Sequence, residues 1–252
     1  MAFYDLEKEE RAALVVTIHN HLKEAFGDNT MLPVILYYAD QDTYIRKTAY
    51  IATGRIYKAH DELKQTLLQM LGQLMSHPEE KVRQTVVNAA GEIGKINFAQ
   101  VQHFFDKGLF DNHHIVRNAV IGSIKKMGEV NPAPVLAWSE TYLAHPDKEI
   151  RREICHGIEL RGRTHPQDIL PLLRSLEWDK TARVRNTLVH VLGQIAYKKG
   201  CLECVVQSLK EWENKALVQD ALKEIVSVHH RYRNFTIYTQ AEAIAYIDAQ
   251  EI

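Results

Sequence analysis

The sequence predicts an all-α protein made of about six helical hairpins, and a recurring phrase is the main observation behind this prediction. The phrase consists of a turn with an acidic residue, an apolar residue and an arginine, followed by an apolar helix. Its arginine column falls at positions 46, 83, 117, 151, 185 and 219, where the last copy is degenerate and has Gln219. The first step is 37 residues and the other four are 34. A fixed period in this range is typical of repeat architectures.

Apolar spacing after each arginine predicts the second helix of every hairpin. Positions 3, 6, 7 and 10 residues after the arginine are mostly apolar, which is one face of a helix. We expect the +3 column to lie in the core, and it consists of Ala49, Val86, Val120, Ile154, Leu188 and Leu222. No segment shows the apolar and polar alternation of hairpin-linked strands.

A further apolar helix precedes each turn, and prolines such as Pro78, Pro132 and Pro146 punctuate the connections. The predicted first helices are Leu32–Tyr38, Leu63–Met75, Val101–Phe110, Val135–Leu143, Ile169–Leu176 and Leu202–Trp212. A single hairpin cannot cover its own apolar face, so the pairs must stack. We therefore expect one domain over residues 1–252, with an N-terminal cap at 1–30, repeats at 31–230 and a C-terminal cap at 231–252. The caps contain the helices Leu6–Phe26 and Thr239–Gln250.

Composition and charge narrow the class of protein and of partner. The 252 residues are 46% hydrophobic and 25% charged, and no apolar run is long enough to span a bilayer. We expect a soluble cytoplasmic protein with no membrane partner and with reduced thiols at its three cysteines. The net charge of −1 conceals a basic middle, since residues 43–142 hold 12 Lys and Arg against 9 Asp and Glu, and residues 143–200 hold 11 against 7. This excess is compatible with an anionic partner but weaker than in dedicated nucleic-acid domains.

The phrase at the start of each second helix, in which an acidic residue is followed by an apolar residue and arginine, resembles HEAT repeats. The resemblance covers about Met31 to His229. The period also matches tetratricopeptide repeats, but their Trp-Leu-Gly-Tyr pattern is absent. The resemblance implies a right-handed α–α superhelix in which second helices line the concave side. It also implies a ladder between the acidic residue and the arginine of adjacent repeats. We therefore expect a structural role, and not a binding role, for these arginines: Arg46, Arg83, Arg117, Arg151 and Arg185.

Two stretches, Ile115 to Pro132 and Ile150 to Arg163, are similar to segments of the bacterial HEAT-like DNA alkylation-repair glycosylases. Those enzymes pair aromatic side chains with a carboxylate in a concave groove. Here none of the tryptophans is followed four residues later by Asp on a predicted groove-lining helix; they are Trp138, Trp178 and Trp212. The resemblance implies a fold and an anionic ligand, and no catalytic residue is carried over.

Metal and cofactor signals are weak. Cys201 and Cys204 form a CxxC, but there is no second pair for zinc, so we expect a structural role with Cys204 in the core. Some HEAT-type hydroxylases bind two irons through His-Glu pairs, and this chain has no His-Glu dipeptide. It also has no Gly-rich phosphate loop and no Gly-x-Ser-x-Gly elbow. The sequence therefore predicts neither a metal nor a cofactor.

The columns expected to face away from the core hold the candidate binding residues. These are +1, +5 and parts of +8 and +9, and they supply donors for phosphate, carboxylate or peptide groups. The candidates are Lys47, Arg55, Asn88, Asn118, Lys125, Arg152, His156, Asn186 and His190. The competing interpretation is a solvated helix face, which is polar in any case. The surface could instead lie on the first helices or at the basic segment His229–Arg233.

The leading functional hypothesis is a non-catalytic scaffold that binds a protein or peptide along the concave face. This hypothesis rests partly on the usual function of proteins with such folds. The alternative is a DNA-binding protein related to the alkylation-repair glycosylases, with or without activity. A metal-dependent hydroxylase is a weaker third hypothesis.

Overall fold

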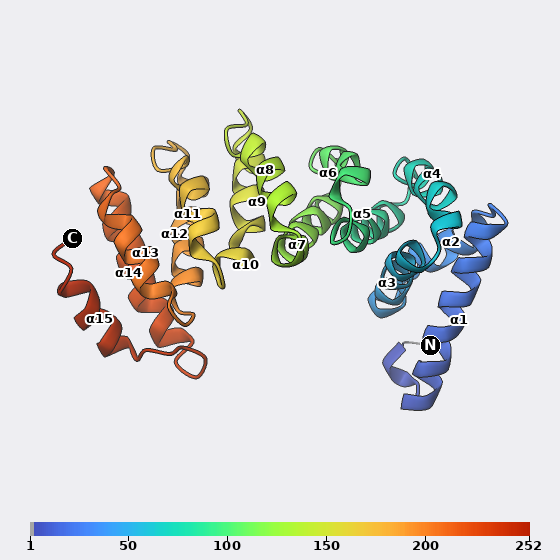
Figure 1. Ribbon diagram of the computed structural model, residues 1–252, viewed down its shortest axis with the longest axis horizontal. Coiled ribbons are helices and arrows are strands. Elements are labelled where there is room, and N and C mark those ends of the chain that lie inside the picture. The colour runs from blue at the N-terminus through green and yellow to red at the C-terminus, as the bar shows by residue number, and fades with distance from the viewer. Residues whose placement is uncertain (1–2) are drawn as a thin grey trace. The chain divides into compact units, whose positions relative to one another are not determined.

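The computed structural model describes residues 3–252, and all regular structure in that range is helical (Figure 1). Contacts group the chain into two compact units, Met1–Met127 and Gly128–Ile252, which are described separately. Six helix pairs occur within residues 3–252, as the repeat period predicts. The all-α fold class of stacked helical hairpins is therefore confirmed, whereas a single domain over residues 1–252 stays a prediction.

The N-terminal unit contains three hairpins preceded by one long helix. Its elements are α1 (Lys8–Gly27), α2 (Leu32–Tyr38), α3 (Thr43–Ala59), α4 (Lys64–Leu74), α5 (Glu80–Gly94), α6 (Gln102–Gly108) and α7 (His114–Val130). The second helices α3 and α5 pack against each other, and α1 packs against α3 on its other side. The N-terminal cap thus occupies the place of a second helix. It buries Ile18, Leu22, Ala25 and Phe26.

The C-terminal unit repeats this plan with one interruption. Its elements are α8 (Pro132–Leu143), α9 (Lys148–Gly157), α10 (Glu159–Gly162), α11 (Pro166–Arg174), α12 (Ala182–Ala196), α13 (Cys201–Lys210), α14 (Lys215–Arg231) and α15 (Gln240–Asp248). The second helices α9, α12 and α14 pack in sequence, and α15 covers α14. The interruption is Ile158, where α9 ends and the single turn α10 begins. No helix within residues 3–252 has the length and apolar character that crossing a bilayer requires.

The predicted core columns are buried. The +3 residues Ala49, Val86, Val120, Ile154 and Leu188 have no exposed surface, and the +10 residues Ile56, Ile93, Met127 and Ile195 have none either. This confirms the facing of the second helices. Because every repeat buries the same columns, adjacent hairpins share one apolar layer within each unit.

Glycines in the +8 column bring second helices close together. A Cβ atom built on Gly91 would lie 2.5 Å from Ser123 Oγ, and one on Gly54 would lie 2.5 Å from the Cβ of Glu92. Gly193 is similarly close to Glu224. Side-chain atoms of the neighbouring second helix bury these three positions, so the partly exposed part of the +8 column includes Lys125.

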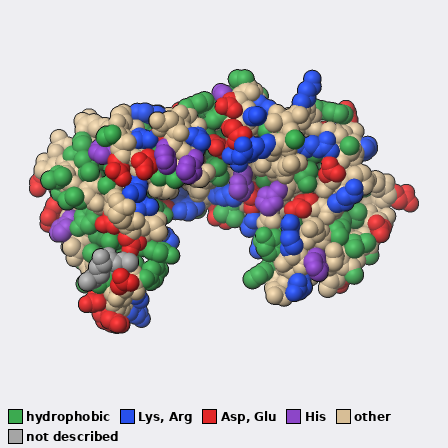
Figure 2. Space-filling view, turned by 180° about the vertical axis from the view of Figure 1, so that it is seen from behind, with side chains coloured by type: hydrophobic (Ala, Val, Ile, Leu, Met, Phe, Trp, Pro, Cys, Tyr) green, Lys and Arg blue, Asp and Glu red, His purple; other side chains and the backbone are tan. Residues whose placement is uncertain are grey.

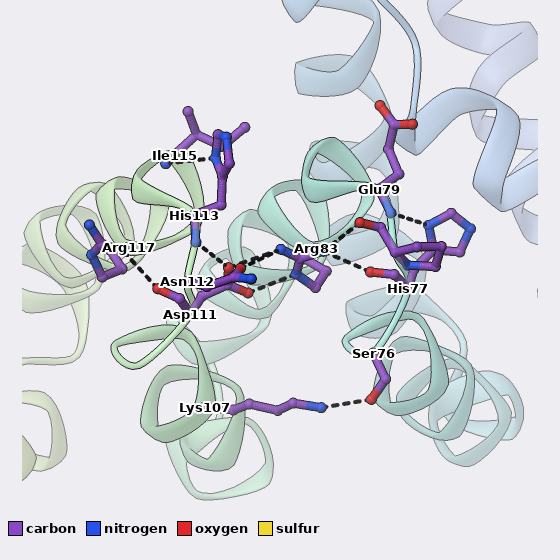
Figure 3. Close-up of polar contacts among 11 residues, drawn as sticks. Ser76, His77, Glu79, Arg83, Lys107, Asp111, Asn112, His113, Ile115 and Arg117 are labelled. Carbon is purple, nitrogen blue, oxygen red and sulfur yellow. Dashed lines mark hydrogen bonds and ion pairs between the residues drawn. The ribbon is translucent and has the colours of Figure 1, made fainter.

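Arg83 makes the predicted ladder contact with the acidic residue of the next repeat (Figure 3). Arg83 donates from Nε and Nη2 to the two carboxylate oxygens of Asp111 in the next repeat, at 2.7 and 2.9 Å. Its Nη1 donates to the carbonyl oxygens of His77 and Pro78 in the turn of its own hairpin, at 2.8 and 2.9 Å. One guanidinium therefore fastens its own turn and the next hairpin at once.

The same arrangement recurs in the C-terminal unit. Arg151 binds both carboxylate oxygens of Asp179, at 2.6 and 3.2 Å, and the carbonyl oxygens of His145 and Pro146. Arg185 instead pairs with Asp220, which lies within α14 of the next hairpin, at an Nη2 to Oδ2 distance of 2.6 Å, and this ion pair is more exposed to solvent. The predicted ladder is thus confirmed for Arg83 and Arg151. Arg46 and Arg117 also hold turns, since they donate to the carbonyl oxygens of residues 40, 41 and 111.

The ladder predicts that acid weakens the fold. Burial alone would raise the pKa of the Asp179 carboxyl, but hydrogen bonds from Arg151 and the Thr181 N–H outweigh it and hold the pKa below its ordinary value. Asp111 is held low in the same way by Arg83 and the His113 N–H. A carboxyl with a lowered folded-state pKa stabilises the fold above its unfolded pKa, and this contribution is lost as pH falls. Urea denaturation should therefore show the free energy of unfolding declining below about pH 4, with a shallower decline in Arg151→Ala. An equally steep decline in that variant would contradict the assignment.

Candidate functional site

All nine predicted binding residues lie on second helices and are exposed or half-buried. Lys47 and Arg55 lie on α3, Asn88 on α5, Asn118 and Lys125 on α7, Arg152 and His156 on α9, and Asn186 and His190 on α12. They form two sets, one in each unit. Charged side chains of both signs and histidines are interspersed on the face shown in Figure 2.

In the N-terminal unit, the +1 and +5 columns form a strip without carboxylates. The +1 residues are Lys47, Gln84 and Asn118, and the +5 residues are Ile51, Asn88 and Gly122. The nearest acid in the +9 column, Glu92, is paired with Lys95 at 2.6 Å. These six residues, named here the N-terminal strip, therefore present one cation, three amides and the apolar Ile51.

A pocket of about 310 Å³ adjoins this strip between α1 and α3. Its walls include Ile51 from the +5 column, Arg55 from the +9 column, and Val16 and His19 from α1. Val16 is 59% exposed, so it offers apolar surface at the edge of the pocket. Burial, together with the nearby charge of Arg55, lowers the pKa of His19, so its ring is neutral at pH 7. The pocket is apolar with one cation at its edge.

In the C-terminal unit, Glu159 occupies the +8 position that is glycine in three other repeats. The helix break at Ile158 places this carboxylate inside the unit, where it is only 2% exposed. One oxygen accepts from Arg163 Nη2 and the other lies 3.1 Å from His156 Nε2. A buried carboxylate requires such partners because desolvation disfavours the charged form.

Arg163 is itself held in place. Its Nη2 donates to Gln194 Oε1 at 2.8 Å, its Nη1 donates to the Tyr197 hydroxyl at 3.3 Å, and its guanidinium carbon lies 5.6 Å from the Tyr197 ring centre. The orientation of Glu159 is therefore fixed through Arg163.

His190 completes a cluster with His156 and Glu159. The two imidazole rings are 6.2 Å apart, edge to face, on α9 and α12. One ligating atom from each of the three residues lies within 4.8 Å of the other two. Beyond this group, Nδ1 of His190 lies 3.7 Å from Glu224 Oε1, and Glu224 also pairs with Arg231. We call His156, Glu159 and His190 the His–Glu–His cluster.

The remaining residues that the sequence singled out lie in the following environments. Arg152 is neutralised by Glu149 at 2.9 Å and Glu153 at 3.3 Å. Cys201 is the buried member of the CxxC and Cys204 is half-buried, which is the reverse of the expectation for Cys204. Burial raises the pKa of Cys201 to about 11, so this thiol is protonated at pH 7. Trp138 and Trp212 are buried, whereas Trp178 is exposed.

Sequence reasoning missed Glu159 and Arg163. It searched for adjacent His-Glu residues, whereas the spacing here is His156-x-x-Glu159, with His190 one repeat of 34 residues after His156. An acidic residue in a column otherwise occupied mainly by glycine was the signal that could have found the site. Departures from a repeat rule are where functional sites are expected.

Comparison with known proteins returns helical repeat proteins. The chain is similar to a HEAT-like repeats protein from the archaeon Thermococcus onnurineus NA1, with 16% identity, a TM-score of 0.40, and coverage of 88% of this chain and 98% of that one. It is also similar to YibA of E. coli, with 16% identity, a TM-score of 0.43, and coverage of 97% and 89%. A computationally designed armadillo repeat protein for modular peptide recognition shows 17% identity, a TM-score of 0.34, and coverage of 77% and 99%. No family model and no curated protein matches the chain.

Proposed function

We propose that this protein is a non-catalytic scaffold that binds an extended peptide segment of a partner protein on its N-terminal strip. The observation that supports this most directly is the pocket between α1 and α3, where exposed Val16 and half-buried Ile51 stand beside Arg55. Ile51 belongs to the +5 column, so one wall of the pocket is a residue of the N-terminal strip.

The chemistry of this surface specifies the peptide. An apolar side chain seated in the pocket would remove Val16 and Ile51 from water. An adjacent Asp or Glu would pair with Arg55 or Lys47, since the +1 and +5 columns of this unit carry no competing carboxylate. The amides of Asn88 and Asn118 would hydrogen-bond the peptide backbone, because an amide both donates and accepts.

The contacts that the basic residues make favour a peptide ligand over duplex DNA. Arg83 and Arg151 are committed to carboxylates, Arg46 to the carbonyl oxygens of Asp40 and Gln41, and Arg152 to two glutamates. These four arginines of the basic middle are thereby engaged within the chain. A phosphate-binding surface needs several cations directed at the ligand.

Selection from a random linear peptide display library tests this proposal. We expect enrichment of peptides with an apolar residue next to Asp or Glu. The double variant Arg55→Ala, Asn88→Ala should bind a selected peptide about tenfold more weakly or worse, with an unchanged melting temperature. The matched control Lys58→Ala, Gln69→Ala removes an exposed cation and an exposed amide from α3 and α4 outside the strip, and it should bind normally.

A duplex DNA oligonucleotide is the competing probe. If the chain bound this duplex with steep loss of affinity as salt rises, and no peptide were enriched, DNA binding would replace the proposal. Equal binding by the two double variants would also contradict it.

A further inference from the structure

We infer that the His–Glu–His cluster of the C-terminal unit is a binding site for one divalent transition-metal ion of the Zn²⁺ type. This site lies on α9, α10 and α12 and is independent of the proposed peptide surface on the N-terminal strip. Its three side chains come from two successive repeats, and the helix break at Ile158 is what brings Glu159 to them.

The distances suit a small cation with nitrogen and oxygen ligands. Zn²⁺ binds imidazole nitrogen and carboxylate oxygen at about 2.0–2.2 Å in tetrahedral sites, so neighbouring ligand atoms lie about 3.3 Å apart. The separation of His156 Nε2 and Glu159 Oε2 is 3.1 Å. The third ligating atom, from His190, lies within 4.8 Å of both. The His190 side chain is 47% exposed, so a small torsional adjustment can bring it to bonding distance.

The residues around the cluster are of the kinds that surround metal ligands in proteins. Ligating carboxylates are usually hydrogen-bonded through their other oxygen, and ligating imidazoles usually donate their other N–H to a carboxylate. Here the second oxygen of Glu159 accepts from Arg163, which Gln194 and Tyr197 hold in turn. Glu224 stands 3.7 Å from Nδ1 of His190. The ligating carboxylate is thus oriented before any ion arrives.

The donor set selects the class of metal. Two imidazoles with one carboxylate suit Zn²⁺, Cu²⁺, Ni²⁺ and Fe²⁺, whereas Mg²⁺ and Ca²⁺ prefer oxygen ligands alone. His156 and His190 are half-buried and exposed, so an ion reaches them from solvent, while Glu159 supplies the negative charge from within. Three protein ligands leave a coordination position for water or for a side chain of a partner.

Calorimetric titration of the full chain with Zn²⁺, after treatment with a chelator, tests this inference. We expect one equivalent of Zn²⁺ to bind, and His190→Ala to weaken binding by about tenfold or more. His190→Ala is the deciding variant because the residue is exposed and its removal leaves the buried Glu159 to Arg163 pair intact. His230→Ala, an exposed histidine of α14, is the matched control and should bind as the native chain does.

Two further measurements separate binding at the cluster from binding at the cysteines. Cys201→Ser, Cys204→Ser should keep one equivalent of Zn²⁺, since the CxxC takes no part. Zn²⁺ should raise the melting temperature of the native chain and of the variant without Cys201 and Cys204 to the same degree, and that of His190→Ala by less. Absence of stoichiometric binding, native affinity in His190→Ala, or loss of binding on removal of the thiols would each overturn the inference. None of these results depends on whether the N-terminal strip binds a peptide.

Discussion

Leu188→Ala should lower the free energy of unfolding by about 2–5 kcal/mol. Leu188 lies in the +3 column of α12, has no exposed surface, and sits in the helix that packs against both α9 and α14. Removing its isobutyl group deletes buried apolar contact and leaves a cavity that a layer bounded by two helices cannot readily close. Urea denaturation followed by circular dichroism measures the loss.

Asn186→Ala, two residues earlier on the same helix, is the matched control. Asn186 is exposed in the +1 column, so its replacement should change the free energy of unfolding by no more than about 0.5 kcal/mol. Similar losses in the two variants would contradict the assignment of buried and exposed columns.

The second large loss of stability is expected when the buried ion pair between Arg151 and Asp179 is broken. Arg151→Ala should cost about 3 kcal/mol, because it leaves the carboxylate of Asp179 without its cation in a place where that side chain is only 6% exposed. The carbonyl oxygens of His145 and Pro146 lose their side-chain donor in the same variant.

Arg185→Ala removes the same residue type from the same column and should cost only about 0–1 kcal/mol. The side chains of Arg185 and Asp220 are 35% and 47% exposed, so water and salt screen their pairing. Thermal denaturation of both variants in one buffer gives the comparison. Equal losses would mean that burial does not set the strength of the ladder.

The sequence predicted those helices whose bounds are determined by interactions within a few residues. The first helix Leu32–Tyr38 was predicted with its observed bounds, and the C-terminal helix Thr239–Gln250 differs from the observed Gln240–Asp248 by one and two residues. Apolar periodicity, a proline at the first turn and a Thr239 cap act within a few residues, so the chain itself displays them. The column facings followed from the period for the same reason.

The candidate sites were only partly predictable because they depend on packing between segments. His156 and His190 were predicted singly, but their meeting with Glu159 requires the break at Ile158, which no proline announces. The pocket beside Arg55 arises because α1 packs as an additional second helix against α3, bringing Val16 next to Ile51. Neither event leaves a periodic signal in the sequence.

The ladder also limits what is lost when adjacent hairpins separate. Arg83 pairs with a carboxylate that lies further along the chain, and both partners also hold their own turns: Arg83 donates to the carbonyl oxygens of its turn, and Asp111 accepts the N–H of His113. Arg151 and Asp179 have the same arrangement. Opening at one such junction therefore breaks the ion pair but leaves the turn on each side held by its own ladder residue.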